Sequence, residues 1–481
     1  MPGPPSAVVG ATPTPPQTRV VALDQLRGLA MAAMLFVNLN FGYAILPPFF
    51  THGVVYTSGP DLVMPLFHFC VGFALRLTVK RRVAAKGWWA TARELASVRV
   101  PGLIMLSLFV TEGWGSFPNW RDVSGFGDWL GTLVRNPAPY HTLTHIAFVT
   151  VYTFPSMCGP PWVRVAHLLA TSALLAALHA TFYFRWISSY FLDEGGYFGF
   201  VGWAIPALAG SLLYDALVAV SASGAPPSVG AASGGGMTPG VTTPLRVDGA
   251  GVVPPPRRHR CSSLYTRCGC RTSTAWLAVD VAVAAVVLGV AAYLLSCLGR
   301  LAPLTVCYNT EVNFYGGYGR QVPCPTVDGG APRWVPAPFV RPPMPDGVVT
   351  MWTMTQRAGT VPYHWFTTAT SLAAFAAVYA AVDIGFRRPS WWPDRVAALV
   401  AGLHTTPGGD TVRLHWHVLE VFGENSLAVY LISSATSDAF SAMVPPNAPV
   451  WYFLLWGEGL MFVIVYIFAR YLRTHKLFLR L

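Results

Sequence analysis

The stretch 23-LDQLRGLAMAAMLFVNLNFG-42 is typical of a helix that crosses a membrane. It contains about 20 mostly apolar residues, which is the length that spans a bilayer as an α-helix. At about 100° per residue, Asp24, Arg27 and Asn38 fall on one stripe of this helix. Arg27 and Asn38 are separated by roughly 16 Å along its axis. Because ionisable groups inside a membrane face a partner or a watery cavity, the stripe predicts a functional face.

A purely structural role for this stripe is the alternative. Asp24 and Arg27 would then pair with each other at the membrane interface, with their charged ends in water. Asn38 would hydrogen-bond to a neighbouring helix and hold the bundle together. The position of Asn38, deep in an apolar run, favours the functional reading more than the positions of the other two do.

The composition of the whole chain extends this membrane interpretation. Of 481 residues, 53% are hydrophobic and only 11% are charged, with a mean hydropathy of +0.46, whereas soluble domains have about 25% charged residues. The apolar runs are long and do not alternate, so we expect an all-α fold, a polytopic transmembrane helical bundle. The expected spans are 23–46, 61–79, 98–115, 141–158, 163–187, 199–220, 275–299, 361–384, 415–440 and 450–472.

The net charge of +11 indicates topology rather than a nucleic-acid partner. Lys and Arg collect on the cytoplasmic connections of membrane proteins. The connection 80–99 and the tail 470–481 are basic, whereas the connection 47–60 has no Lys or Arg. The basic segments 257–271 and 387–395 fall on the cytosolic side by the same count. Both termini are therefore predicted to be cytosolic, and His52 is predicted to be lumenal or extracellular.

Three segments differ from the helical remainder of the predicted transmembrane domain, residues 19–481. Residues 1–18 are rich in Pro and Thr and predict a disordered cytosolic leader. Residues 221–274 are rich in Gly, Ser and Pro and end in basic residues, which predicts a disordered cytosolic loop. Residues 301–360 are Pro-rich and are expected to form a lumenal loop, in which Cys307 and Cys324 can pair in an oxidising compartment.

Two histidines and an aspartate lie around the start of the second predicted span. Asp61 is placed to cap the N-terminus of that helix. His68 follows on nearly the same face, where a packing role is the simpler reading. His52 lies in a short loop beside aromatic residues, and a neutral imidazole is a general base near pH 7. The loop therefore makes His52 a candidate catalytic residue.

Several segments, taken in order, resemble the heparan-α-glucosaminide N-acetyltransferase family. The run 22-ALDQLRGLAMAAMLFVN-38, then His52, then 61-DLVMPLFHFCVG-72 are similar to the first helix, the histidine loop and the second helix of that family. Three later segments keep the family order: 193-DEGGYFGFVGWAIPALAG-210, 362-PYHWFTTATSLAAFAAVYAAVD-383 and 423-GENSLAVYL-431. The resemblance covers most of the chain from about residue 19.

This resemblance implies transfer of an acetyl group from cytosolic acetyl-CoA to an amine of a glycan or amino sugar on the other side. It makes His52 the acetyl-accepting or general-base histidine, and Asn38 the residue that polarises the acetyl carbonyl or holds the amine. It assigns Asp24, Arg27, Asn425 and Ser426 to acetyl-CoA, and Asp61, His68 and Glu194 to the acceptor.

The chain departs from the family pattern at three places. His145 stands where the family has an arginine, in 141-HTLTHIAF-148. The proline of the family's D-P-E-G turn is absent before Glu194, and the lead to Trp365 is altered. The general chemistry is compatible with these changes, whereas a heparan substrate does not follow. Another amino sugar, a hydroxyl or a lipid-linked glycan would also fit as the acceptor.

No metal site is predicted. His141 and His145 are four residues apart and are a possible zinc pair, but no carboxylate is fixed beside them by spacing. The simpler interpretation is a hydrated helix end. The cysteines of 261-CSSLYTRCGC-270 are expected to be reduced free thiols.

Two other functions fit the same residues. A transporter or channel would also carry Asp, Arg and Glu inside the membrane, although the chain shows no internal repeat. A non-catalytic membrane scaffold would explain the altered motifs at His145 and near Trp365. In every case we expect a multi-pass protein in contact with membrane lipid. The membrane would be an endomembrane, lysosome-like or plasma membrane. A homodimer is compatible with this interpretation.

Overall fold

The computed structural model describes most of the helical part of the chain. The described residues are 20–39, 43, 45–52, 57–110, 125, 127, 141–189, 194–223, 274–298, 305–308, 321–322, 348–384, 386–387, 403–405, 411–414 and 416–479. The predicted leader, most of the 221–274 loop and the Cys307–Cys324 pairing lie outside the described residues or side chains.

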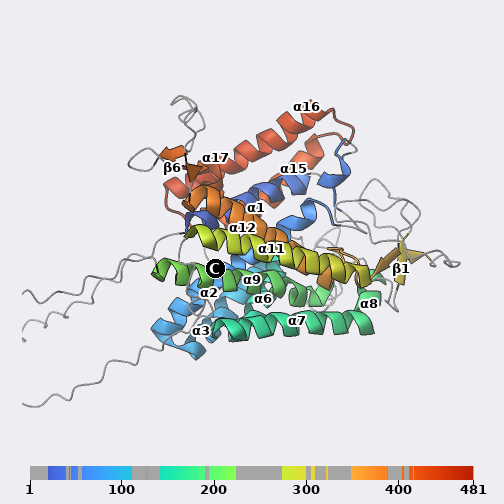
Figure 1. Cartoon of the computed structure of the whole chain (residues 1–481). Coiled ribbons are helices and arrows are strands. Elements are labelled where there is room, and N and C mark those ends of the chain that lie inside the picture. Colours follow the sequence, from blue (N-terminus) through green and yellow to red (C-terminus); the bar gives the residue numbers. More distant parts are fainter. Residues whose placement is uncertain are drawn as a thin grey trace, which may run out of the picture.

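The architecture is a bundle of long helices that run roughly side by side (Figure 1). The long helices are α1 (Val21–Leu39), α2 (Val63–Lys86), α6 (Thr142–Met157), α7 (Pro161–Thr181), α9 (Gly199–Ser223), α11 (Thr274–Ser296), α12 (Val361–Tyr379), α15 (Ser426–Met443) and α17 (Leu460–Thr474). The shorter helices are α3 (Trp88–Glu94), α4 (Val100–Val110), α8 (Tyr183–Ser189), α14 (His417–Glu424) and α16 (Val450–Tyr452).

Short 3-10 and π-helical segments extend or join these helices. The 3-10 segments are η1 (Pro48–Phe50), η2 (Pro60–Leu62) and η5 (Gly196–Phe198), and the π-helical segments are η3 (Leu95–Arg99), η7 (Ala380–Ile384) and η8 (Phe453–Gly459). The segment η8 makes α16 and α17 one continuous helix, and η7 extends α12 to Ile384.

Seven helices within the described ranges are long and apolar enough to cross a membrane, which indicates an integral multi-pass membrane protein. They cover Val21–Leu39, Pro60–Lys86, Pro161–Thr181, Gly196–Val220, Trp276–Ser296, Val361–Ile384 and Val450–Thr474. The other three predicted spans, 98–115, 141–158 and 415–440, contain the shorter helices α4, α6 and α14 with α15. Their membrane crossing stays a prediction.

The structure corrects two details of the predicted organisation. The span expected over 415–440 is broken, because Asn425 leaves the helical conformation (φ −117°, ψ 33°) and separates α14 from α15. The connections also contain strands. Two antiparallel three-stranded sheets have the orders β2-β1-β3 and β4-β6-β5. Their strands are β1 (Thr305–Tyr308), β2 (Gln321–Val322), β3 (Val348–Thr350), β4 (Phe386–Arg387), β5 (Leu403–Thr405) and β6 (Thr411–Leu414).

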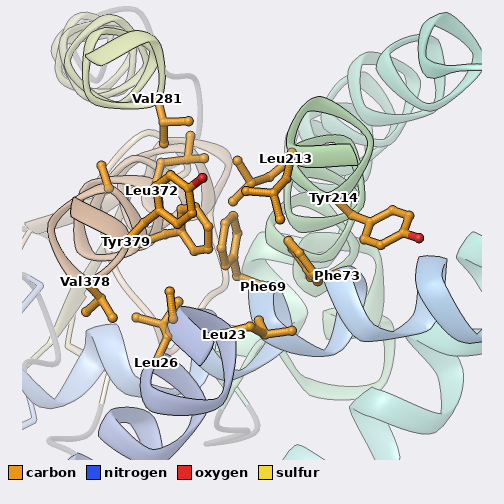
Figure 2. Close-up of a cluster of buried hydrophobic side chains, with 14 of the residues drawn as sticks. Leu23, Leu26, Phe69, Phe73, Leu213, Tyr214, Val281, Leu372, Val378 and Tyr379 are labelled. Carbon is orange, nitrogen blue, oxygen red and sulfur yellow. The ribbon is translucent and has the colours of Figure 1, made fainter. Parts of the chain in front are cut away.

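Helix α1 lies in the middle of the bundle, with apolar clusters on both sides. Figure 2 shows one cluster, in which Leu23 and Leu26 of α1 meet Phe69 and Phe73 of α2 and side chains of α9, α11 and α12, including Leu372. A second cluster joins α1 to α4, α6, α14, α15 and α17. Burial of large apolar side chains contributes roughly 1.5–3 kcal/mol each, so α1 is fixed from both sides.

Two glycines bring α1 unusually close to α14. A Cβ atom added to Gly28 would lie 1.8 Å from the carbonyl oxygen of Leu419, and one added to Gly423 would lie 1.9 Å from the carbonyl oxygen of Asp24. Each glycine thus faces the backbone of the other helix. The motifs that contain Gly28 and Gly423, 23-LDQLRG-28 and 423-GENS-426, are therefore packed against each other.

The start of α1 is also tied to the end of the α12 helix. Oδ2 of Asp383 accepts the backbone N–H of Ala22 at 3.0 Å. The first N–H groups of a helix have no partner within the helix, and a carboxylate there complements the helix dipole. The V-D pair that closes the 362–383 segment therefore fixes the beginning of α1.

Candidate functional site

A cavity of about 690 Å³ opens at the end of the bundle where α1 and α15 finish and where α2, α6 and α9 begin. Its volume falls within the roughly 300–1,000 Å³ of typical ligand pockets. Met31, Met34 and Asn38 of α1 form one of its sides. These three residues recur at helical spacing, so the cavity follows one face of α1 inward for about 10 Å, at 1.5 Å rise per residue.

The polar lining of the cavity, among the described residues, comes from six separate places in the chain. These are Asn38, His52, the pair His141 and Thr142, Glu194, Gln356, and the α15 residues Tyr430, Ser434, Ser437 and Asp438. The remaining lining is mostly apolar, with Val63, Met64 and Phe67 from α2 among it. A mostly apolar hollow with a few converging polar groups is the usual form of a small-molecule site.

His52 is held by a buried aspartate. Its Nδ1 atom lies 2.7 Å from Oδ1 of Asp61, whose side chain is completely buried, whereas the His52 side chain is 29% exposed. Because a carboxylate can only accept hydrogen bonds, Nδ1 carries the proton of the neutral ring and Nε2 is left as the acceptor. A histidine in this tautomer can take a proton from a bound amine or hydroxyl.

The Asp61 carboxylate is itself fixed by Ser58. Its Oδ2 atom accepts the backbone N–H of Ser58 at 2.7 Å and the Ser58 hydroxyl at 2.9 Å. The predicted N-cap position of Asp61 is therefore wrong, because Leu62 is the N-cap of α2 and Gly59 that of η2, while the Asp61 carboxylate bonds backward to Ser58 and across to His52. The hydroxyl of Tyr363 donates to the Asp61 carbonyl at 2.6 Å and ties this segment to α12.

Asn38 lies in the last turn of α1 and is half-buried at the cavity wall. The hydroxyl of Ser437 donates to its backbone carbonyl at 2.8 Å, which joins α1 to α15. Asn38 and His52 therefore border the same hollow although one ends a helix and the other lies in a loop. A side-chain amide beside an imidazole can donate to a carbonyl oxygen while the imidazole takes a proton.

Glu194 reaches the cavity from the turn before η5. Its backbone has a positive φ of 57°, and Gly195 and Gly196 follow with φ of 82° and 59°. A non-glycine residue in this region is uncommon and often marks a functional turn. Burial raises the pKa of the Glu194 carboxyl, but the hydrogen bond and positive charge of His141 outweigh this effect and hold the pKa below its usual value.

The other predicted site residues lie elsewhere. His68 is buried and stacks on Trp203, with 5.1 Å between ring centres, as expected for a packing residue. Arg27 donates from Nη2 to the Ser426 hydroxyl at 2.8 Å, at the break between α14 and α15. None of Asp24, Arg27, Asn425 or Ser426 is part of the described cavity lining. Of the predicted residues, Asn38, His52 and Glu194 line the cavity, with Asp61 bonded to His52, whereas His68 belongs neither to the cavity lining nor to the Arg27–Ser426 contact.

This second location has an unusual polar group. The Asn425 side chain is 1% exposed, and neither its amide nitrogen nor its amide oxygen has a hydrogen-bond partner among the described residues. Asn425 directly precedes α15, so its side chain lies at a helix N-terminus next to Arg27 and Ser426. Helix N-termini inside membrane bundles bind anionic groups.

Sequence reasoning missed the α15 side of the cavity. Tyr430, Ser434, Ser437 and Asp438 lie within about 100° of each other on a helical projection. The same angular reading that selected the stripe on α1 would have found them. His141 was considered only as a metal ligand. In the structure, its Nδ1 lies 3.6 Å from Oε1 of Glu194.

No arrangement of three or more His, Cys, Asp or Glu residues suited to a metal ion is present in the described part of the chain. No protein-family model matches the chain, and no curated protein matches it either. The functional inference therefore depends on the residues of the cavity and of the Arg27–Ser426 contact.

Proposed function

We propose that this protein is a membrane acetyltransferase that moves an acetyl group from acetyl-CoA to an amine of a glycan or amino sugar. The observation that carries the proposal is the His52–Asp61 pair on the wall of a cavity that also contains Asn38. The order of sequence motifs that resemble the heparan-α-glucosaminide N-acetyltransferase family supports it independently.

The chemistry follows from the tautomer of His52. The acceptor ammonium first loses one proton to water and enters the step as a free amine. Nε2 of His52 then removes one proton from this amine as its nitrogen bonds to the acetyl carbon. The carbon–sulfur bond breaks and its electron pair goes to sulfur, which receives a proton from the His52 imidazolium. Asp61 stabilises that imidazolium in the meantime, because it is a buried carboxylate 2.7 Å from Nδ1. The products are the N-acetylated sugar and coenzyme A.

Asn38 supports the same step. An oxyanion develops on the acetyl oxygen as the amine attacks, and a fixed amide N–H stabilises it. Removal of one such donor typically costs about 100- to 1,000-fold in kcat. The Ser437 hydroxyl donates to the backbone carbonyl of Asn38 and so fixes the end of α1. The backbone from which the Asn38 amide extends is therefore held in place.

The donor would enter from the other end of α1. Arg27, Ser426 and Asn425 together provide a guanidinium, a hydroxyl and an unsatisfied amide at the N-terminus of α15. This combination suits the phosphates of acetyl-CoA. Arg27 precedes the cavity residue Met31 by one helical turn, about 6 Å, so the thioester arm would have a short distance to cross before it meets His52.

The distribution of basic residues supports this direction. Lys80, Arg81, Arg82 and Lys86 follow one another at the end of α2, and Arg473 lies at the end of α17. Arg473 is paired with Glu424 of α14 at 2.9 Å, on the helix that meets the start of α1. These ends lie away from the cavity, which is bordered by the beginning of α2 and the finish of α1. Cytosolic acetyl-CoA would meet this basic end.

The direct test is acetyl-CoA binding to detergent-purified protein by calorimetry. We expect saturable binding by the wild type, at least tenfold weaker binding by Arg27→Ala, and unchanged binding by Arg93→Ala. Arg93 is a matched control because it is an exposed arginine of α3 in the basic 80–99 region. Absence of binding to well-folded wild-type protein would refute the acetyltransferase proposal and favour a transporter or a scaffold.

A further inference from the structure

The proposed acetyl transfer removes two protons from the acceptor nitrogen. An ammonium has three N–H bonds, whereas the amide product has one. His52 delivers one of the two protons to the sulfur of coenzyme A, so the other proton has to leave the cavity for water. A single imidazole holds only one of them at a time, because its protonated form has no acceptor nitrogen. A second proton acceptor in the cavity lining would therefore serve the reaction directly.

His141 is the second histidine in the described part of the cavity lining. It comes directly before α6 as the N-cap residue, with an extended backbone (φ −101°, ψ −177°), whereas His52 lies in the connection between α1 and α2. The His141 side chain is 43% exposed, compared with 29% for His52. A proton that His141 accepts inside the cavity can therefore pass on to water.

The carboxylate of Glu194 determines which nitrogen of His141 accepts a proton. Oε1 of Glu194 lies 3.6 Å from Nδ1 of His141. Burial raises the pKa of the Glu194 carboxyl, but the hydrogen bond and charge of His141 outweigh this effect and keep the group ionised at neutral pH. Because a carboxylate only accepts hydrogen bonds, Nδ1 carries the proton of the neutral ring and Nε2 is the acceptor nitrogen. The negative charge also stabilises the imidazolium that forms when Nε2 takes up a proton.

The position of this carboxylate is fixed from α6, α9 and α15. The Thr142 hydroxyl donates to Oε1 of Glu194 at 3.4 Å and is also hydrogen-bonded to Tyr430 of α15. The indole N–H of Trp203 in α9 donates to the Glu194 carbonyl at 2.8 Å and holds the positive-φ turn. The Glu194 oxygen that contacts His141 therefore stays at a constant place beside the ring.

An imidazole suits this proton transfer better than the carboxylates of the lining do. Carboxylates titrate at about 4 in model peptides and are weak bases toward an ammonium, whereas an imidazole titrates at about 6.5. Proton transfer is most efficient when the base titrates near the working pH. The other ionisable groups at this end of the bundle are His52, Glu194, Tyr430 and Asp438 in the lining, His145 one turn further along α6, and Asp61, His68 and Arg357 behind it.

We propose that His141 is a second proton carrier of the cavity, which takes one proton from the acceptor ammonium and passes it to water. This inference rests on the proposed acetyl transfer, because it completes the proton balance of that step. One N–H bond of the ammonium breaks, its electron pair stays on nitrogen, and the proton goes to Nε2 of His141. The free amine then attacks the acetyl carbon and gives its next proton to Nε2 of His52. The His141 imidazolium releases its proton to water, and Glu194 acts as a positioning residue throughout.

The test compares acetyl transfer to D-glucosamine at two pH values, with the full chain purified in detergent. The amine of glucosamine titrates at about pH 8, like an α-amino group, so it is mainly an ammonium at pH 6 and mainly a free amine at pH 9. For His141→Gln we expect kcat/KM at least about tenfold below that of the wild type at pH 6, and within about twofold of it at pH 9. The free amine has already lost the proton that His141 removes.

Three further variants separate this role from a structural one. His52→Ala should lose activity at both pH values, because the free amine still has to give up one proton. Glu194→Gln should show a smaller loss than His141→Gln, again at pH 6 and not at pH 9. His475→Gln changes an exposed histidine after α17 and should match the wild type at both pH values. If thermal unfolding shows that His141→Gln is misfolded, Glu194→Gln carries the comparison.

The outcomes distinguish this inference from the acetyltransferase proposal. An equal loss at pH 6 and pH 9 would show that the change at His141 acts only on the structure, and full activity of His141→Gln at pH 6 would show that the reaction does not use this histidine. Either result overturns the inference and leaves the transferase in place. Absence of N-acetylglucosamine from the wild type at both pH values would refute the transferase itself, and this inference with it.

Discussion

Nδ1 of His52 lies 2.7 Å from Oδ1 of Asp61, nine residues further along the chain. His52 is partly exposed on a cavity wall, whereas Asp61 is completely buried behind it. The pair thus combines an imidazole that a molecule in the cavity can contact with a carboxylate that is held in a fixed position. The first prediction concerns this pair.

Asp61→Asn should remove most of the activity and leave acetyl-CoA binding intact. The amide can donate to Nδ1, which favours the tautomer with a proton on Nε2, so the imidazole can no longer accept a proton from the amine. We expect kcat for acetyl transfer to fall about 100- to 10,000-fold, with the acetyl-CoA dissociation constant within twofold of wild type.

Ser58→Ala is the matched control for Asp61. It deletes the hydroxyl that donates to Oδ2 at 2.9 Å but leaves the backbone N–H donor at 2.7 Å. Its effect on kcat should be much smaller than that of Asp61→Asn. Equal kcat for Asp61→Asn and wild type would show that the carboxylate does not set the tautomer of His52.

Gly28→Ala should destabilise the bundle. The new methyl group would lie 1.8 Å from the carbonyl oxygen of Leu419, so α1 and α14 would have to separate. Overpacking of this kind typically costs about 1–3 kcal/mol and occasionally more. Gly289→Ala is the control, since its methyl would meet only Ala369 at 3.8 Å. Thermal unfolding in detergent should show a lower midpoint for Gly28→Ala than for the wild type, and an unchanged midpoint for Gly289→Ala. Equal midpoints for all three proteins would contradict the close approach of α1 to α14.

Asp215→Asn should be strongly destabilising for an electrostatic reason. Asp215 accepts hydrogen bonds from Arg76 at 3.1 and 3.0 Å, and it also pairs with Arg164, which is completely buried. Without the carboxylate, two buried guanidinium groups would face each other, which typically costs about 3–5 kcal/mol.

The control for Asp215 is Glu94→Gln. Glu94 also pairs with two cations, Arg82 and Lys86, but its side chain is 33% exposed, so that water screens the charges. Chemical denaturation in detergent should separate the two variants clearly. Similar unfolding midpoints would mean that the Arg76–Asp215–Arg164 network contributes little.

The stability difference between wild type and Glu194→Gln should depend on pH. The pKa of Glu194 is lower in the folded protein, because the hydrogen bond and charge of His141 outweigh the effect of burial. The ionised carboxylate therefore contributes stability that is complete above its unfolded pKa, about 4.3, and that disappears as the pH falls through its folded pKa. We expect the wild type to lose more stability than the variant between pH 6 and pH 3.5.

Thermal unfolding of both proteins across this range measures the effect, with Glu424→Gln as a carboxylate control at the other end of the bundle. Parallel pH profiles for wild type and Glu194→Gln would contradict the assignment of a stabilising His141–Glu194 interaction.

Much of the fold could be predicted from the chain because membrane helices have a strong compositional signal. Seven of the ten predicted segments coincide with helices long enough to cross a membrane. The break at Asn425 was missed because the mostly apolar segment 415–440 was interpreted as one continuous span, although Gly423, Asn425 and Ser426 have low helix propensity. The strands in the connections were missed because each is only two to four residues long, too short to give a recognisable alternating pattern.

The candidate site was predictable only in part. The position of Asn38 on the polar stripe of α1 follows from helix geometry. The hydrogen bond from Ser437 of α15 to the Asn38 carbonyl could not be predicted, because helix geometry says nothing about which helix packs against this stripe. The His52–Asp61 contact joins a loop to a helix start, and no periodicity relates them. The role of His141 was hidden because its partner, Glu194, is 53 residues away in a positive-φ turn.

The most direct test of the central claim is acetyl transfer across a reconstituted membrane. Proteoliposomes would enclose D-glucosamine, with acetyl-CoA supplied outside, and N-acetylglucosamine formed inside would be measured for wild type and His52→Ala. We predict product with the wild type and a rate at least about 100-fold lower with His52→Ala, at equal protein content and equal acetyl-CoA binding. A full rate with His52→Ala, or loss of enclosed glucosamine without acetyl-CoA and without product, would contradict the acetyltransferase account.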